Sequence, residues 1–154
     1  MKFGIVLALA VLAMSPIGQA QQAPQIFSAH DTESQLGSLM QTAKAAGSAG
    51  AVLGNYQSHS IQLSARTASG GAEVHAHYDD IFVVTQGEAT LITGGTVENG
   101  QTGSDGETKG KSIRGGQSQR VGKDDLVHIP AGTPHQLIIT PGSSFSAIVI
   151  KVKE

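Results

Sequence analysis

Histidines and aspartates gather in one short segment of this 154-residue chain. The segment contains His75 and His77, separated by one alanine, and then Asp79 and Asp80. Residues two apart in a β-strand face the same way, so the two imidazoles project together and can converge on one metal ion. A turn is expected after His77, and either Asp79 or Asp80 could add an oxygen ligand just after that turn.

A third histidine follows a tight turn later in the chain. Pro130, Gly132 and Pro134 supply the turn residues, and His135 stands at the start of the next predicted strand. A His-x-His pair alone is a weak signal, because histidines facing solvent are common. A third histidine presented by a Pro-x-Gly turn strengthens the prediction of a metal site.

The segments that carry these histidines have the pattern of short β-strands. From about residue 51, alternating apolar residues are separated by glycines, which predicts about eight to ten strands in a sandwich or barrel. Within this region, Gln86-Gly87-Glu88 is interpreted as a hairpin turn between strands at 81–85 and 89–93. The 20 glycines and the absence of tryptophan agree with many tight turns rather than a helical bundle.

Residues 21–50 precede the strands and contain one predicted helix. Apolar residues of 33–46 repeat at the spacing i, i+3, i+4 and i+7, which places them on one helical face. Thr32 with Gln35 fits a capping box at the start, and Gly47 is a plausible C-cap. We expect this helix to cover an edge or end of the sheet.

Residues 94–116 interrupt the strand pattern and are rich in glycine and small polar residues. Such a stretch predicts a long loop or a hairpin excursion. It is interpreted as a tolerated surface insertion or, alternatively, as a mobile flap over the mouth of the site.

The first 20 residues have the pattern of a secretory signal peptide. Lys2 precedes an apolar run over 4–14, and Gly18 and Ala20 are the small residues of a cleavage site. An uncleaved membrane anchor is the alternative, but the run is shorter than the roughly 20 residues of a membrane-spanning helix. We therefore expect a bacterial periplasmic or secreted protein that begins at Gln21 and leaves the membrane after cleavage.

Composition excludes several classes of protein. Hydrophobic residues make up 39% and charged residues 14%, which is too apolar for a disordered chain. The net charge of −2 argues against nucleic acid as a partner, because phosphate-backbone binding needs clustered lysines and arginines. The absence of cysteine excludes disulfides and thiolate metal ligands.

Together the two histidine segments resemble the two motifs of the cupin family. In the first cupin motif, a His-x-His pair is followed after three or four residues by Glu and then, after six more, by Gly. The matching residues here are His75, His77, Asp80 and Gly87. The match departs from the motif in two ways, because the acid is Asp rather than Glu and the gap before it is one residue short.

The second cupin motif is matched with its Pro-x-Gly-x2-His spacing intact. Its residues here are Pro130, Gly132 and His135, whereas Ile139 stands where the family has Asn. The resemblance covers roughly residues 57–153, which is most of the chain after the signal peptide.

The resemblance implies an all-β fold, a cupin double-stranded β-helix or jelly-roll-like barrel over residues 51–154. It also implies one divalent transition metal held by His75, His77, Asp80 and His135. Fe, Mn, Cu, Ni and Zn all accept such ligands. Four protein ligands leave two positions open on an octahedral ion, so the metal can act as a Lewis acid or a redox centre. A homodimer is a further expectation from the resemblance.

These expectations lead to a metal-binding cupin with a small-molecule substrate or ligand. The leading hypothesis is a metal-dependent enzyme of the oxygenase, isomerase or lyase class that acts on a small oxygen-rich molecule. The alternative is a non-catalytic periplasmic module that binds a metal or a small ligand, and a third reading is a structural barrel. The sequence identifies no catalytic residue besides the expected metal ligands.

Overall fold

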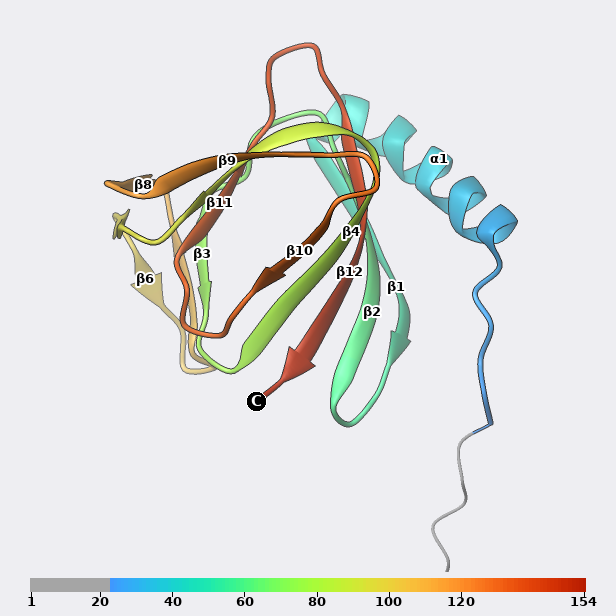
Figure 1. Ribbon diagram of the computed structural model, residues 1–154, viewed down its shortest axis with the longest axis horizontal. Coiled ribbons are helices and arrows are strands. Elements are labelled where there is room, and N and C mark those ends of the chain that lie inside the picture. The colour runs from blue at the N-terminus through green and yellow to red at the C-terminus, as the bar shows by residue number, and fades with distance from the viewer. Residues whose placement is uncertain (1–22) are drawn as a thin grey trace, which may run out of the picture.

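A computed structural model describes residues 23–154, so the predicted signal peptide lies outside the described residues. In the described part, one helix is followed by twelve strands (Figure 1). The predicted all-β class with one N-terminal helix is confirmed. Within residues 23–154, no helix has both the length and the apolar character needed to cross a membrane.

Helix α1 (Ala29–Ala46) begins earlier than the sequence pattern indicates. Ser28 is the N-cap, and its side-chain oxygen accepts a hydrogen bond from the backbone N–H of Asp31 at 3.1 Å. The predicted Thr32-Gln35 capping box is therefore wrong, because the cap lies four residues earlier. Gly47 ends the helix with a φ of 84°, as predicted. Leu36 and Ala43 are buried on the face that packs against the first two strands.

One long strand, β4 (Tyr78–Thr93), takes part in two sets of antiparallel strands. Its first half pairs with β12 (Phe145–Lys153) and with β10 (Leu126–Ile129). Its second half pairs with β11 (His135–Ile138) and with β9 (Gln117–Gly122). Figure 1 shows the two sets facing each other across the interior of the molecule.

The other strands extend these two sets. On one side, β2 (His59–Arg66) pairs with β12, and β1 (Ser48–Asn55) pairs with β2. On the other side, the order β11, β3 (Ala72–His75), β7 (Glu107–Gly110) and β6 (Gln101–Thr102) continues the sheet. The buried apolar core lies between the two sets, with Phe82, Val84, Leu91, Ile129 and Phe145 among its members.

Gly87 is the bend of β4 and not the tip of a hairpin. The predicted hairpin at 86–88 is wrong, because β4 runs through this point and exchanges its neighbours there. Gly87 has a φ of 77°, in the left-handed region. A Cβ at this position would collide with the carbonyl oxygen of Ser144, so the bend requires glycine.

The glycine-rich residues 94–116 form short strands. Besides β6 and β7, the segment contains β5 (Thr96–Glu98) and β8 (Ser112–Arg114), which pair with each other as a separate two-stranded sheet. Because β7 pairs with β3 and places Glu107 opposite His75, the segment reaches the histidine cluster directly.

Candidate metal centre

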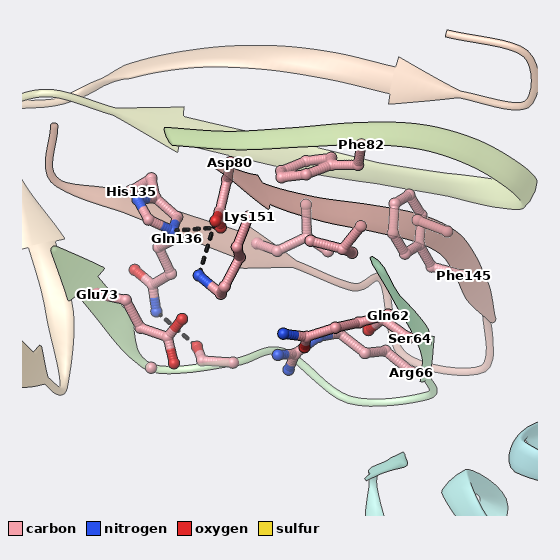
Figure 2. Close-up of a pocket in the computed structure, with 15 residues that line it drawn as sticks. Gln62, Ser64, Arg66, Glu73, Asp80, Phe82, His135, Gln136, Phe145 and Lys151 are labelled. Carbon is pink, nitrogen blue, oxygen red and sulfur yellow. Dashed lines mark hydrogen bonds and ion pairs between the residues drawn. The ribbon is translucent and has the colours of Figure 1, made fainter. Parts of the chain in front are cut away.

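A cavity of about 210 Å³ lies between the two sets of strands. Asp80 and Lys151 enter it from neighbouring positions of β4 and β12, and His135 enters it from the start of β11 (Figure 2). Phe82 and Phe145 form part of its apolar wall. The cavity therefore combines titratable groups with an apolar wall, as small-molecule sites do.

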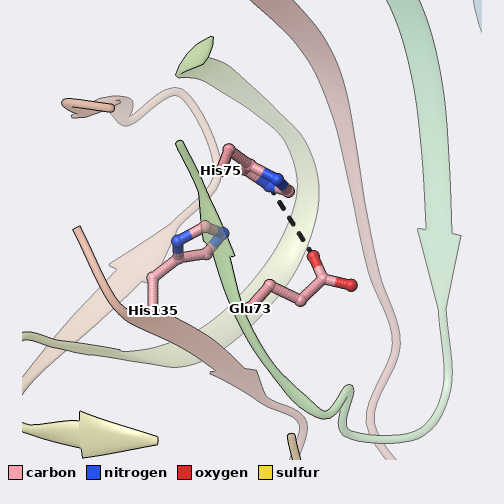
Figure 3. Close-up of side chains that lie close together, drawn as sticks. All are labelled: Glu73, His75 and His135. Atoms are coloured by element: carbon pink, nitrogen blue, oxygen red, sulfur yellow. Dashed lines mark ion pairs between the residues drawn. The ribbon is translucent and has the colours of Figure 1, made fainter. Parts of the chain in front are cut away.

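Strand pairing brings three metal-binding side chains to one point. Glu73 and His75 are two residues apart on β3, so they share one face of the strand. Glu73 is also the cross-strand partner of His135 on β11. Figure 3 shows the three side chains turned toward one another. Their ligand atoms all lie within 4.8 Å of one another, so the group could hold a metal ion.

Asp80 adds a second carboxylate to this group. Its Oδ2 atom lies 3.3 Å from Nε2 of His75 and 3.8 Å from Nε2 of His135, and Oε2 of Glu73 lies 3.8 Å from Nε2 of His75. Two atoms that each lie about 2.1 Å from one ion are separated by roughly 3 to 4.2 Å, depending on the angle between them. All three separations fall within this range.

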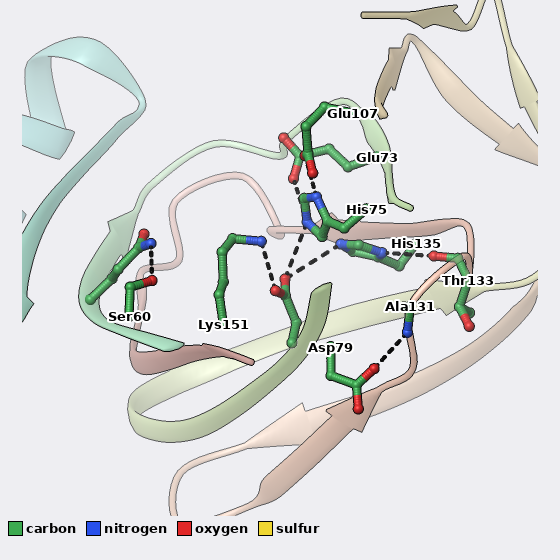
Figure 4. A network of polar contacts seen from close by, with 11 residues as sticks. Ser60, Glu73, His75, Asp79, Glu107, Ala131, Thr133, His135 and Lys151 are labelled. Atoms are coloured by element: carbon green, nitrogen blue, oxygen red, sulfur yellow. Dashed lines mark hydrogen bonds and ion pairs between the residues drawn. The ribbon is translucent and has the colours of Figure 1, made fainter. Parts of the chain in front are cut away.

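The imidazoles are oriented by partners on their far side. Nδ1 of His75 contacts the carboxylate of Glu107, and Nδ1 of His135 lies 3.0 Å from the carbonyl oxygen of Thr133 (Figure 4). A carboxylate or carbonyl on one ring nitrogen is how proteins orient histidines that bind metal through the other. Nε2 of His75 is fully buried and has no hydrogen-bond partner among the described residues. This donor set fits a divalent transition metal.

Burial and charge act against each other on the titratable groups of the cluster. Burial lowers the pKa of His75, but the neighbouring Asp80 and Glu107 carboxylates outweigh it and the pKa is raised. Burial alone would raise the pKa of Asp80, yet the adjacent His75 imidazole at 3.3 Å and the Lys151 ammonium, whose Nζ lies at 2.7 Å, lower it. For His135, burial dominates and lowers the pKa. The cluster thus holds an ionised aspartate beside one histidine that stays neutral more readily than usual.

The structure brings together three of the four residues expected to bind metal, namely His75, Asp80 and His135. His77 is not beside them. The expected strand through both histidines is wrong, because β3 ends at His75 and His77 lies exposed in the turn before β4. The alternation rule does not extend through a turn, so the two imidazoles do not share a face. The assignment of the expected four residues as ligands stays a prediction.

Glu73 is the member of the cluster that the sequence analysis missed, although the chain contains a signal for it. Four residues separate His75 from Asp80, which is the longer gap of the first cupin motif, and six more precede Gly87. In that register, Glu73 and His75 take the place of the His-x-His pair, and the gap is no longer one residue short. Glu73 also lies two residues from His75 on β3, so the two side chains point to the same face of the strand.

Asp79, the alternative acid ligand, is hydrogen-bonded to the turn that precedes His135. Its Oδ1 atom accepts a hydrogen bond from the backbone N–H of Ala131 at 2.8 Å (Figure 4). Its Oδ2 atom lies 2.8 Å from Nε2 of His128. These contacts lower the pKa of Asp79, His128 contributing most. Of the two aspartates, Asp80 therefore lies in the histidine cluster. Asp79 instead contacts Ala131 in the turn that begins at Pro130.

Comparisons with known proteins identify the fold. No family model matches the chain, and no curated protein matches it in sequence. A Klebsiella pneumoniae protein described as uncharacterized and conserved, with a double-stranded beta-helix domain, is similar in structure with a TM-score of 0.58. It is 14% identical, and the match covers 85% of this chain and 91% of that one.

Two further solved structures have the same architecture. The Cnp3 cupin domain of Schizosaccharomyces pombe is 13% identical with a TM-score of 0.52, over 70% of this chain and 65% of that one. The DMSP lyase DddQ of Ruegeria pomeroyi is 19% identical with a TM-score of 0.51, over 70% of this chain and 47% of that one. This chain thus spans about half of the lyase. At these identities the likeness concerns the fold, and it confirms the predicted double-stranded β-helix.

Proposed function

We propose that this chain, which has the cupin fold, binds one divalent transition metal and is a metal-dependent enzyme for small molecules. The ligands in this proposal are His75, His135, Glu73 and Asp80. The observation that carries it is the convergence of Glu73, His75 and His135, whose ligand atoms all lie within 4.8 Å of one another, with Oδ2 of Asp80 3.3 Å from Nε2 of His75. Two imidazole nitrogens and two carboxylates this close together are the nitrogen and oxygen ligands that divalent transition metals accept.

Proton-transfer chemistry is the class that the cavity favours among oxygenase, isomerase and lyase reactions. A bound divalent ion supplies a Lewis acid there. Lys151 lines the same cavity, and its ammonium donates a hydrogen bond to Asp80 at 2.7 Å. This ammonium can give a proton from Nζ to a leaving group or a developing oxyanion, and the resulting amine can take the proton that an isomerisation or an elimination removes from the substrate. Phe82 and Phe145 form the apolar part of the same cavity.

Metal content measured on single-residue variants tests the ligand set. Untagged protein is reconstituted with Fe, Mn, Cu, Ni and Zn in turn and then analysed for bound metal by elemental analysis. We expect near-stoichiometric metal in the wild type, at least a tenfold loss of affinity in Glu73→Ala and in His75→Ala, and no loss in His77→Ala. Circular dichroism verifies that each variant folds.

Each alternative has its own result in this experiment. Loss of metal in His77→Ala with retention in Glu73→Ala would support the ligand set expected from the sequence. No metal in the wild type after reconstitution would refute the proposal. Metal binding with stabilisation by small molecules, but with no turnover of them, would assign the chain as a binding module.

Two further parts of the proposal concern the protein outside this cavity. We propose that the chain is secreted or periplasmic, because residues 1–20 have the pattern of a signal peptide. N-terminal sequencing of protein exported from a bacterial host should begin at Gln21. The homodimer stays a prediction from the cupin resemblance, and light scattering at micromolar concentration tests it.

A further inference from the structure

Strand β2 turns a row of polar side chains toward the cavity. Gln62, Ser64 and Arg66 alternate along the strand and line the same space as the metal centre. The residues between them, Leu63 and Ala65, face the other way and are almost completely buried. Polar side chains turned into the interior of a barrel cost folding free energy unless they find partners. Gln62 has such a partner, because its amide donates a hydrogen bond to Ser60 at 3.0 Å, whereas Arg66 has none among the described residues.

Arg66 is the member of the row that carries charge. Its side chain is half-buried, and it forms no ion pair with any residue of the described part of the chain. The guanidinium lies against Gly70, where a Cβ would approach Nη1 to 2.9 Å. Figure 2 shows Arg66 and Gln62 entering the cavity from the side opposite His135. Gly70 thus leaves room for a guanidinium that faces the cavity.

The other charges of the lining have partners, whereas Arg66 has none among residues 23–154. Lys151 is paired with Asp80, and Glu73 belongs to the histidine cluster. Two carboxylates and two basic side chains balance along the lining, so a bound divalent cation makes the cavity net positive. A half-buried guanidinium in such a cavity attracts an anion and can bind it through two parallel hydrogen bonds.

We propose that Arg66, supported by Gln62 and Ser64, is an anion subsite of the same cavity. Its ligand is a small molecule with a carboxylate or phosphate group on Arg66 and a second oxygen-bearing group that reaches the metal centre. The proposal rests on the proposed function, because the second group needs the metal. It narrows the substrate from a small oxygen-rich molecule to a small anion.

Calorimetric titration of cobalt-loaded protein tests the subsite. The probes are the straight-chain diacids from malonate to adipate, the matched neutral diamides, and phosphonoacetate as the phosphate arm. We expect at least one acid to bind and its diamide to bind at least tenfold more weakly. The length of the diacid that binds best measures the span between Arg66 and the metal centre. Comparison of the diacids with phosphonoacetate shows whether the subsite prefers a carboxylate or a phosphate-like group.

Variants of Arg66 separate the subsite from the metal centre. Arg66→Gln should weaken binding of the acid at least tenfold, Arg66→Lys should recover part of it, and both should bind cobalt like the wild type. Arg120→Gln is the matched control, because Arg120 lies on the outer surface and pairs with Glu88. The visible spectrum of the bound cobalt reports whether the second oxygen group reaches the metal.

The outcomes for the subsite and for the metal centre are distinguishable. Unchanged acid binding in cobalt-loaded Arg66→Gln overturns the subsite, and so does the absence of binding by every acid to the loaded wild type. A wild type that takes up no cobalt overturns the proposed function instead. In that case, acid binding to the metal-free protein that Arg66→Gln abolishes supports the anion subsite alone.

Discussion

Removal of the Glu107 carboxylate perturbs the candidate metal centre without touching the metal ligands. The variant Glu107→Gln keeps the shape of the side chain but removes the charge that faces Nδ1 of His75. The carboxylate fixes the imidazole with Nε2 toward Glu73 and Asp80 and makes that nitrogen a stronger donor. Its loss should therefore weaken metal binding while the fold is retained.

The expected size of the effect follows from the exposure of Glu107. Loss of a partner that orients a metal-binding histidine typically lowers metal affinity by about 10- to 100-fold. The Glu107 side chain is 26% exposed, so water screens part of its charge and the lower half of that range applies. We expect affinity about 10- to 30-fold weaker, which corresponds to about 1.4 to 2 kcal/mol.

Competition with a chelator of known affinity measures this loss directly. Glu98→Gln is the matched control, because Glu98 lies in the same glycine-rich segment but contacts Arg114 and Ser112 instead of a histidine. The control should bind metal like the wild type. Equal metal affinity in Glu107→Gln and the wild type would refute the role of Glu107, and an equal loss in both variants would trace the effect to the segment as a whole.

Two further predictions concern stability. Gly87→Ala should lower the free energy of unfolding by at least about 3 kcal/mol in urea denaturation, because it adds a collision with Ser144 to the strain of a positive φ. Gly94→Ala, with a φ of 71° and open space around it, should cost only about 1 kcal/mol, and equal losses would contradict the collision. As a function of pH, the raised pKa of His75 contributes stability below 6.5 that is lost as the pH rises through the folded-state pKa. The lowered pKa of His135 means that stability is lost as the pH falls from 6.5 through its folded-state pKa. In chelator-treated protein, the stability contributed by His75 should therefore fall above pH 6.5, and the stability contributed by His135 should fall below it. Thermal denaturation as a function of pH should show a smaller decrease above pH 6.5 in His75→Gln and a smaller decrease below pH 6.5 in His135→Gln.

Local sequence patterns were sufficient for the fold class and for part of the candidate site. Alternation of apolar residues between glycines predicted strands, since each short strand buries one face. The Pro-x-Gly turn before His135 predicted the start of β11, because turn chemistry is local. The same patterns failed at Gly87, where a glycine allows a bend that continues the strand as readily as a turn that reverses it.

The difference between Glu73 and His77 shows where local patterns stop. Both lie two residues from His75, so alternation alone treats them alike. Which one joins the cluster depends on where β3 ends, and that end is decided by its pairing with β11 and β7. The partners of these strands come from residues more than thirty positions away, and no local pattern contains them.

The sequence by itself determined the strand-rich class, the resemblance to the cupins and the presence of metal-binding side chains in two short segments. Only the tertiary structure decided that Glu73 rather than His77 lies beside His75 and His135, that Glu107 contacts His75, and that Lys151 and Arg66 line one cavity. The physical reason is that hydrophobic periodicity is a property of neighbouring residues, whereas a binding site is built by the register between strands far apart in the chain.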